Sequence, residues 1–342
     1  MPFVPPTATT PEYALVIFDA AGREVVEADG SALSAAVAAR VVAGGDADVV
    51  LMCHGWLDDL TDAKNTYRGW LTTAHGSGWP EASAPLVVGV HWPSVPAAAG
   101  EPPDVPAQLQ AHLTDGSLLA ALGNAGVELA DFLSFWSMRE RAISFGAADA
   151  GLGRLLARIF AARPGVRVHL VGHSLGCVAL SAALVVAGAA RGPHAASFFL
   201  VQAAESSWAF SASAPFFTGG AGKYAAVVSE GLVDGALVAT RSSHDEALTV
   251  LYRLGMEFVL ERSYAAASAG RPARSAAIGA EGLGFDPPVA SAGPLPALAP
   301  GASAFVVAPG RQYSIDCSAV IAGHNDVDHV ELARLFFAMV VA

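Results

Sequence analysis

The chain is poor in charged residues, and this shortage excludes several classes of protein. Only 15% of its 342 residues are charged, against about 25% in an ordinary domain. Lys64 and Lys223 are the only lysines, and the formal net charge is −12. Such an acidic chain is poorly suited to phosphate backbones and to anionic membrane surfaces. We therefore expect no nucleic acid and no membrane as a partner, and a small neutral or apolar molecule fits better.

Cysteines are also scarce, and long apolar runs are missing. Cys53, Cys177 and Cys317 are odd in number and lie in apolar segments, which favours buried, reduced thiols over a disulfide framework or a metal cluster. The longest apolar run, residues 177–190, is shorter than the roughly 18 residues of a membrane span. Residues 1–11 have neither a basic start nor an apolar signal core. A cytoplasmic location is therefore the default expectation.

The sequence does contain a regular alternation of short apolar runs and longer helical patterns. This alternation is typical of an α/β protein whose mainly parallel sheet carries helices on both faces. We expect strands at 13–18, 23–26, 48–53, 86–91, 166–171, 197–202, 236–240 and 312–321, and helices at 62–74, 118–162, 177–189, 247–261 and at the C-terminus. The first two strands, joined across Gly22, predict an N-terminal β-hairpin.

The chain shows no internal repeat and no separate linker. Its length suits one large α/β domain, so we interpret residues 1–342 as a single unit. Segments rich in Pro, Gly and Ala interrupt the pattern at about 95–128, 206–230 and 265–303. These segments predict surface or cap excursions over the carboxyl edge of the sheet.

Residues 172–176 match the Gly-x-Ser-x-Gly nucleophile elbow. The motif alone is common by chance, but here a predicted buried strand precedes it and a predicted helix follows it. Such a turn strains the backbone of the serine, and the small flanking residues let neighbouring backbones approach. A serine hydroxyl is a poor nucleophile at neutral pH and needs a base beside it. Ser174 is therefore the candidate nucleophile, and the base has to be sought elsewhere in the chain.

A carboxylate and two histidines follow the elbow in the order that this motif predicts. Asp245 comes shortly after the predicted strand 236–240, at the carboxyl edge of the sheet, and is the candidate acid. His324 lies three residues past the last predicted strand, beside Gly323, and is the preferred base. His329 falls in the first turn of the last predicted helix and remains the alternative.

The negative charge that forms on a carbonyl oxygen during nucleophilic attack needs backbone donors placed in advance. Leu175 follows the nucleophile and supplies one N–H group. The loop His54-Gly55-Trp56 follows an early predicted strand, and Trp56 is the second predicted donor. Residues 175 and 56 are therefore the candidate oxyanion hole.

Other motifs give weaker signals. The glycine-rich stretch 219–223 is followed by Tyr224 where a phosphate loop needs Ser or Thr, which argues against nucleotide binding. The acidic residues around His324 and His329 lack a recognised metal-ligand spacing. We therefore expect no metal and no cofactor. Four aromatic residues could either cover an apolar substrate or belong to the core; they are Trp208, Phe210, Phe216 and Phe217.

The order of these motifs along the chain resembles that of the α/β-hydrolase superfamily. The resemblance extends over nearly the whole chain. Within this superfamily, the chain is similar to poorly characterised bacterial serine hydrolases through Trp92-Pro93-Ser94 and residues 242–245 and 277–280. The oxyanion loop departs from the His-Gly-Gly-Gly of many esterases, because Trp56 follows Gly55.

The resemblance implies an α/β-hydrolase fold and a serine hydrolase with a catalytic triad of Ser174, Asp245 and His324. The leading hypothesis is a carboxylesterase that acts on a small, apolar ester through an acyl-enzyme. An amidase, a thioesterase or an acyltransferase would use the same triad. An inactive scaffold that binds a ligand is the alternative from another class. The sequence carries no signal for an oligomeric state.

Overall fold

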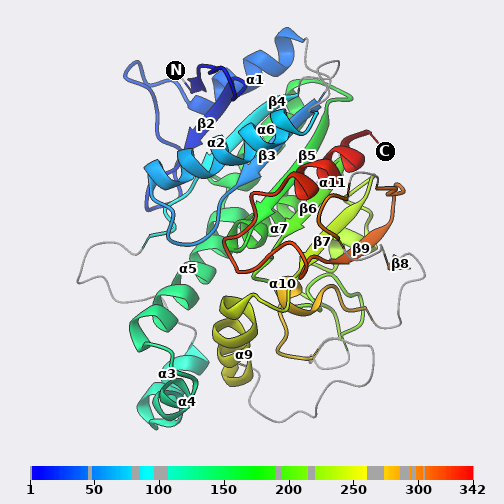
Figure 1. Cartoon of the computed structure of the whole chain (residues 1–342). Helices are drawn as coiled ribbons and strands as arrows, with labels where there is room; N and C mark the ends of the chain where they lie inside the picture. Colours follow the sequence, from blue (N-terminus) through cyan, green and yellow to red (C-terminus); the bar gives the residue numbers. More distant parts are fainter. Residues whose placement is uncertain are drawn as a thin grey trace.

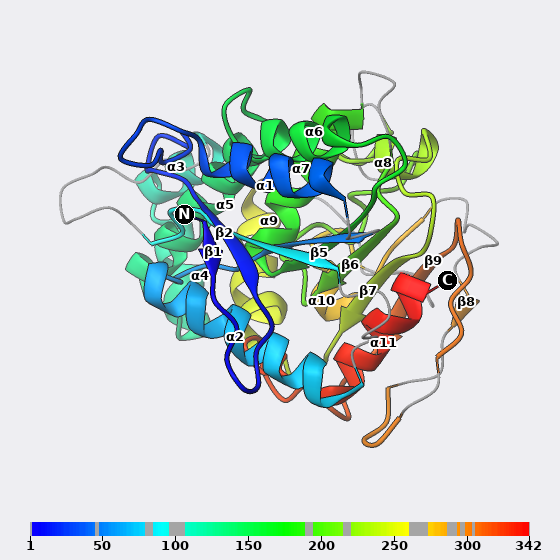
Figure 2. The ribbon, with the colours of Figure 1, turned by 90° about the horizontal axis from the view of Figure 1, so that it is seen from above.

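A nine-stranded sheet with helices on both faces runs through the molecule (Figures 1 and 2). The computed structural model describes residues 2–44, 48–78, 85–95, 107–188, 194–214, 220–259, 273–285, 293–294, 298–302 and 305–341. The strands are β1 (Phe3–Val4), β2 (Tyr13–Ile17), β3 (Asp48–Cys53), β4 (Leu86–His91), β5 (Arg167–His173), β6 (Ser197–Val201), β7 (Leu237–Arg241), β8 (Gly293–Pro294) and β9 (Gln312–Asp316).

The strand order is β1-β2-β4-β3-β5-β6-β7-β9-β8, and every neighbouring pair is parallel except β1 with β2. Parallel pairing places the carboxyl ends of the strands at one edge of the sheet. The inner strands are buried on both faces, which explains their continuous Val and Leu runs. The predicted α/β class with a mainly parallel sheet is confirmed.

The helices divide between the two faces of the sheet. They are α1 (Leu33–Ala43), α2 (Leu60–Gly76), α3 (Ala107–Thr114), α4 (Ser117–Ala125), α5 (Leu129–Ala147), α6 (Leu152–Ala162), α7 (Leu175–Gly188), α8 (Ala226–Ser229), a π-helical segment η2 (Ala247–Tyr252), α9 (Arg253–Val259), α10 (Ile278–Glu281) and α11 (Val330–Val341). In Figure 2, α1, α6 and α7 cover one face, and α2 and α11 cover the other. Helix α7 is buried along nearly its whole length, so its sequence is apolar on all sides.

Two predicted strands differ from the structure. Residues 23–26 form no strand: they make single bridges, such as Phe18 with Glu24, and the antiparallel partner of β2 is β1. The Asp19 carboxylate accepts hydrogen bonds from the backbone of Ala21 and Arg23, which fixes a local turn. The predicted N-terminal hairpin is therefore not confirmed. The last strand, β9, ends at Asp316 and is five residues shorter than predicted.

The segments predicted as excursions contain regular elements. Helices α3 and α4 pack against α9, beyond the carboxyl ends of the strands in Figure 1. In the second segment Trp208 and Phe210 are fully buried core residues, whereas Phe216 and Phe217 lie outside the described residues. The third segment contributes α10 and β8 within its described part.

Two further sequence predictions concern cysteines and membrane spans. The three cysteines are buried and free, as predicted. No single helix in the described ranges combines the length and the apolar character that crossing a membrane requires. One pair, Ser117–Ala125 with Leu129–Ala162, meets these criteria only jointly, across a bend of 108°.

Candidate active site

Ser174 occupies a sharp turn between β5 and α7. Its φ of 53° lies in the left-handed region, which is strained for a residue with a side chain. Its backbone N–H donates to the carbonyl of Val201 on β6, which fixes the turn. A Cβ atom on Gly176 would lie 2.5 Å from the carbonyl oxygen of His54. Glycine is therefore required there, because α7 begins directly against the loop that follows β3.

The structure brings Ser174, His324 and Asp245 together in one hydrogen-bonded chain. The Nε2 atom of His324 lies 2.7 Å from Oγ of Ser174, and its Nδ1 atom lies 2.7 Å from Oδ2 of Asp245. A carboxylate oxygen can only accept, so Nδ1 carries the proton and Nε2 is left to accept the serine proton. This is the arrangement of nucleophile, base and orienting acid that serine catalysis needs.

Asp245 is fully buried and has two further hydrogen-bond donors. The backbone N–H of Leu248 donates to Oδ1 at 3.0 Å, and the side chain of Gln202 donates to Oδ2 at 2.8 Å. Gln202 Nε2 also donates to the carbonyl of Gly279, and its Oε1 accepts from the hydroxyl of Thr240. All the hydrogen-bonding groups of this buried amide therefore face fixed partners. The sequence prediction missed Gln202; its only signal was a polar residue at the end of a buried strand.

The loop that carries His324 is longer than predicted and is held from several sides. His324 lies eight residues after the end of β9 at Asp316, not three. The Ser242 hydroxyl donates to the carbonyl of Ile321 at 2.7 Å. The carbonyl of His324 lies 3.0 Å from Nε2 of His173, the residue before the nucleophile. Burial among protein atoms, with His324 beside it, lowers the pKa of His173 to about 4, so a neutral ring serves as this donor.

The other two histidines near the predicted acid and base lie elsewhere. His329 Nε2 is 2.9 Å from Oδ1 of Asp326, immediately before α11. This contact orders the loop after His324. His244 is exposed beside Asp245. Of the two competing histidines, His324 is the one that contacts Ser174.

The predicted oxyanion loop lies directly against the nucleophile. A Cβ atom on Gly55 would lie 3.1 Å from Cβ of Ser174, so the backbone on the N-terminal side of Trp56 passes next to the serine. Leu175 is the first residue of α7, and the N–H groups of a first helical turn have no partner within their helix. Both predicted donors therefore belong to segments that adjoin Ser174.

A buried histidine braces this loop. The backbone N–H of Trp92 donates to Nε2 of His54 at 3.2 Å, and the Trp92 indole donates to the His54 carbonyl at 2.9 Å. Nδ1 of His54 lies 3.0 Å from the carbonyl of Gly55. Burial lowers the pKa of His54 to about 3, which keeps the ring neutral and suited to both bonds. Trp92 therefore holds the predicted oxyanion loop in place.

The described non-glycine residues with positive φ are Leu57, Ser174 and Gln202, and all three border this site. Ser174 is the predicted nucleophile, Gln202 contacts the predicted acid, and Leu57 follows the predicted donor Trp56. Strained backbone of this kind persists only where the surrounding structure enforces it, and it concentrates at active sites. The strained backbone therefore lies in the same region as the hydrogen bonds that join Ser174, His324 and Asp245.

Solvent reaches the three residues mainly at the imidazole. Ser174 is 1% exposed and Asp245 is fully buried, whereas 15% of the His324 side chain is exposed. The indole of Trp56 donates to the Ser134 hydroxyl at 3.2 Å and packs edge-on against Phe135 of α5. Ser174 and Asp245 are therefore shielded from solvent, and α5 packs against Trp56 of the predicted oxyanion loop.

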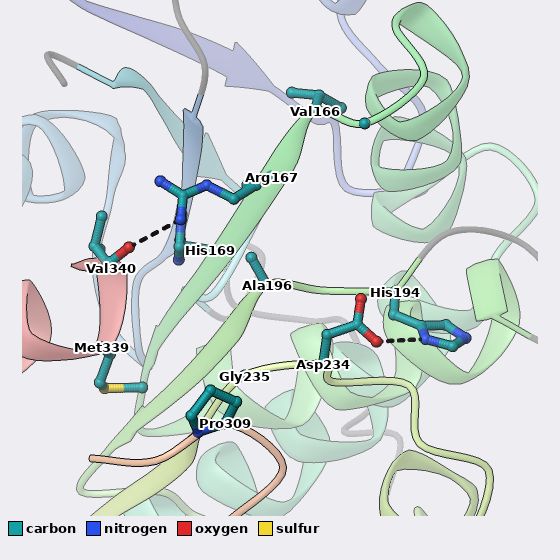
Figure 3. A pocket seen from close by; sticks show the side chains of 11 residues that line it. Val166, Arg167, His169, His194, Ala196, Asp234, Gly235, Pro309, Met339 and Val340 are labelled. Atoms are coloured by element: carbon teal, nitrogen blue, oxygen red, sulfur yellow. Dashed lines mark hydrogen bonds and ion pairs between the residues drawn. The ribbon is translucent and has the colours of Figure 1, made fainter. Parts of the chain in front are cut away.

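A pocket of about 460 Å³ lies at the opposite edge of the sheet, where β5 and β6 begin (Figure 3). Arg167 in this pocket forms a two-bond ion pair with Asp48 and donates to the carbonyl of Val340. His194 is paired with Asp234. None of the predicted site residues lines this pocket. Within the described ranges, no group of three or more His, Cys, Asp and Glu side chains is placed to hold a metal ion.

Comparison of the chain with protein-family models, with curated proteins and with solved structures found no match. Any function assigned to this site therefore depends on its geometry and chemistry.

Proposed function

We propose that the chain is a serine hydrolase of the α/β-hydrolase type that cleaves carboxylic esters of small molecules. The observation that carries this proposal is the pair of 2.7 Å contacts that join Ser174 to His324 and His324 to Asp245. The elbow strain at Ser174 and the approach of Gly55 to it also support the proposal.

In the first half-reaction Ser174 Oγ attacks the acyl carbon of the ester, and Nε2 of His324 accepts the hydroxyl proton. Asp245 holds the imidazole in the required tautomer and stabilises the imidazolium. The backbone N–H groups of Leu175 and Trp56 would stabilise the negative oxygen of the tetrahedral intermediate. The bond between the acyl carbon and the alcohol oxygen then breaks, and His324 gives its proton to the leaving alcohol.

In the second half-reaction a water molecule attacks the acyl carbon, and His324 takes one of its protons. The bond from the acyl carbon to Oγ then breaks, the carboxylic acid leaves, and the proton returns to Ser174. The residues named above suffice for both halves, so the proposal needs no cofactor.

The proposal is tested with a panel of short-chain nitrophenyl esters and with a fluorophosphonate probe. We expect the wild-type chain to hydrolyse esters and to be labelled at Ser174, and Ser174→Ala to lose both, with a loss of at least about 10³-fold in kcat. Ser229→Ala, at the exposed end of α8, is the control and should retain both. Turnover that survives in Ser174→Ala would refute the nucleophile.

The same two measurements separate the alternatives. Labelling at Ser174 without ester turnover would indicate an amide, a thioester or an acyl acceptor other than water as the physiological reactant. Absence of both labelling and turnover in a folded wild-type chain would indicate an inactive binding scaffold.

A further inference from the structure

Five side chains place buried polar atoms together on the side of the site that α5 and α7 cover. Six buried polar atoms here lack a partner of good hydrogen-bonding geometry in the described part of the chain: Trp136 Nε1, Arg139 Nε, both oxygens of Glu205 and the hydroxyls of Tyr224 and Tyr252. Arg139 lies close enough to lower the pKa of Tyr252. All these residues except Arg139 are at most 4% exposed, and 14% of the Arg139 side chain is exposed. Buried polar groups are normally paired, so such a cluster requires an explanation.

The side chains of this cluster, which we call the polar chamber, lie near one another. The rings of Trp136 and Tyr252 stack with centroids 5.8 Å apart, and the Arg139 guanidinium lies 5.3 Å from the centroid of the Trp136 ring. Arg139 and Glu205 each influence the pKa of both tyrosines. The unpaired atoms therefore surround one region of the interior.

The polar chamber is built on the segments that carry the candidate site. The N–H of Ala204, the neighbour of Glu205, donates to the carbonyl of Ser174 at 3.3 Å. Tyr252 ends the segment η2, whose Leu248 N–H donates to Asp245. A π-helical segment of this kind is often found at functional sites.

Two more contacts connect the polar chamber to the site. Phe135, the neighbour of Trp136, packs edge-on against Trp56 of the oxyanion loop, with centroids 5.5 Å apart. Ser181, another buried hydroxyl without a partner of hydrogen-bonding geometry in the described chain, lies on α7 close enough to lower the pKa of Glu205. It is seven residues, or roughly 10 Å of helix, from Ser174. The side chain of Phe135 thus connects the polar chamber to the predicted oxyanion loop.

The chemistry of the polar chamber selects an uncharged acceptor. Arg139, Trp136 and the two tyrosines offer N–H and O–H donors. Arg139 already has an ionic partner in Glu140, 3.0 Å away. Burial raises the pKa of Glu205 to about 8, so at neutral pH this side chain is mostly an uncharged carboxylic acid. Lys223 is the other charged group close enough to influence the pKa of Glu205. An uncharged oxygen would satisfy the unpaired donors, whereas a carboxylate among these side chains would add a buried ion that has to be desolvated.

We propose that the polar chamber binds the acyl group of the substrate and selects acyl chains that carry an uncharged oxygen, such as a ketone or ether, a few carbons from the ester. This inference rests on the proposed function and adds the substrate class to it. Between the neutral and the apolar molecules that the composition favours, it specifies a neutral one with an acceptor, because the buried side chains next to Phe135 carry unpaired hydrogen-bond donors.

The experiment compares nitrophenyl esters of matched length: pentanoate with 4-oxopentanoate, and hexanoate with 5-oxohexanoate. Each value of kcat/KM is divided by the rate of alkaline hydrolysis of the same ester, so that intrinsic reactivity cancels. We expect the wild-type chain to prefer the oxo ester by about tenfold or more in at least one pair, as for one satisfied hydrogen bond. A half ester of glutarate, which carries a carboxylate at similar reach, should be the poorest substrate.

Tyr224→Phe and Tyr252→Phe remove one hydroxyl each and keep the packed ring. We expect each to reduce the oxo preference, measured as the ratio of kcat/KM for an oxo ester to kcat/KM for its unsubstituted partner, by about fivefold to tenfold. Tyr13→Phe is the matched control, because the Tyr13 hydroxyl is also buried without a partner of good hydrogen-bonding geometry in the described chain but packs among the residues of the other face. It should leave the preference unchanged.

The outcomes separate the two proposals. Two outcomes would overturn the proposal for the polar chamber and leave the proposed function standing. One is ester turnover that depends on Ser174 but shows no oxo preference in the wild type. The other is an oxo preference that survives in both tyrosine variants. A preference for the glutarate half ester would overturn the uncharged class. Turnover that does not depend on Ser174 would overturn the proposed function itself.

Discussion

The side-chain amide of Gln202 donates a hydrogen bond of 2.8 Å to Oδ2 of Asp245, the same oxygen that contacts His324. The orientation of this amide is fixed, because its oxygen accepts from the Thr240 hydroxyl and its nitrogen also donates to Gly279. Gln202 therefore connects β6, β7 and α10 at the point where the candidate acid is held. It is a positioning residue for Asp245 and does not contact Ser174 in any bond described above.

Replacing Gln202 by Met should lower kcat by about tenfold to a hundredfold, because the acid loses a donor that fixes its orientation. KM should stay within twofold, since the Gln202 amide faces Asp245, Gly279 and Thr240. Steady-state kinetics on one ester separate the two constants. Gln312→Met, whose amide donates to the carbonyl of Gly310 at the start of β9, is the control. Equal losses in kcat from both variants would contradict a specific role for Gln202.

Gly55→Ala tests the approach of the oxyanion loop to the nucleophile. The added Cβ would lie 3.0 Å from Nδ1 of His173 and 3.1 Å from Cβ of Ser174, so the loop has to move. We expect kcat to fall by about 10²-fold, comparable to the loss of one oxyanion donor. Gly76→Ala is the control, because a Cβ atom there meets nothing within 4 Å. Wild-type kcat in Gly55→Ala would remove this loop from the proposed mechanism.

The two histidines of the last loop should differ in their effect on activity. His324→Ala removes the group that contacts Ser174 and should lower kcat by at least about 10³-fold. His329→Ala breaks a contact with Asp326 and should retain most of the activity. Fluorophosphonate labelling rates provide a second measurement that does not need a substrate. The reverse ranking of the two variants would exchange their roles.

The pH dependence of stability tests the buried Glu205. Its pKa is raised by burial from 4.5 to about 8. Between these values the unfolded chain has released a proton that the folded chain retains, so stability falls as pH rises, by at most about 1.4 kcal/mol per pH unit. Glu205→Gln has no such proton. Urea unfolding should show the variant gaining stability over wild type between about pH 5 and about pH 8.

The exposed residue Glu230 offers the control for this measurement. The difference between Glu230→Gln and wild type should be the same at both pH values. A Glu205→Gln difference that does not change with pH would show that this carboxyl group titrates normally in the folded chain.

The positions of Ser174 and Asp245 could be predicted because each lies shortly after a buried strand. Residues that follow parallel strands lie at the same edge of the sheet. The local strand patterns and this one topological rule were therefore enough to predict both positions. His324 was predicted from two signals, a distance of three residues from the last strand and the small Gly323 beside it. The structure ends that strand at Asp316, so the first signal was wrong and the second remains.

Gln202 and the polar chamber could not be predicted in the same way. The partners of Gln202 on β7 and after it lie 38 and 43 residues away in the chain. Trp136 and Tyr252 have the spacing of ordinary core residues in their helices, and only the packing of η2 on α5 reveals their unpaired polar atoms. Contacts between residues so far apart in the sequence can be identified only from the three-dimensional arrangement of the helices and strands.

The local errors in the fold have physical causes as well. Val25 and Val26 are 41% and 54% exposed, so the short segment 23–26 that was predicted as a second hairpin strand covers no core. Helix α1 was not predicted, because its Ala-rich sequence follows Ala32 and no side chain caps its start. Tertiary packing against α6 supplies what the local signal lacks.

The strand β1 at one margin of the sheet has two residues, whereas β5 is flanked by the full ladders of β3 and β6. Fraying at this margin breaks few backbone bonds, while opening the centre requires most of the molecule to unfold. Amide hydrogens on the strand before Ser174 should therefore exchange only through global unfolding. The reacting groups would keep their relative positions through the fluctuations that open the periphery.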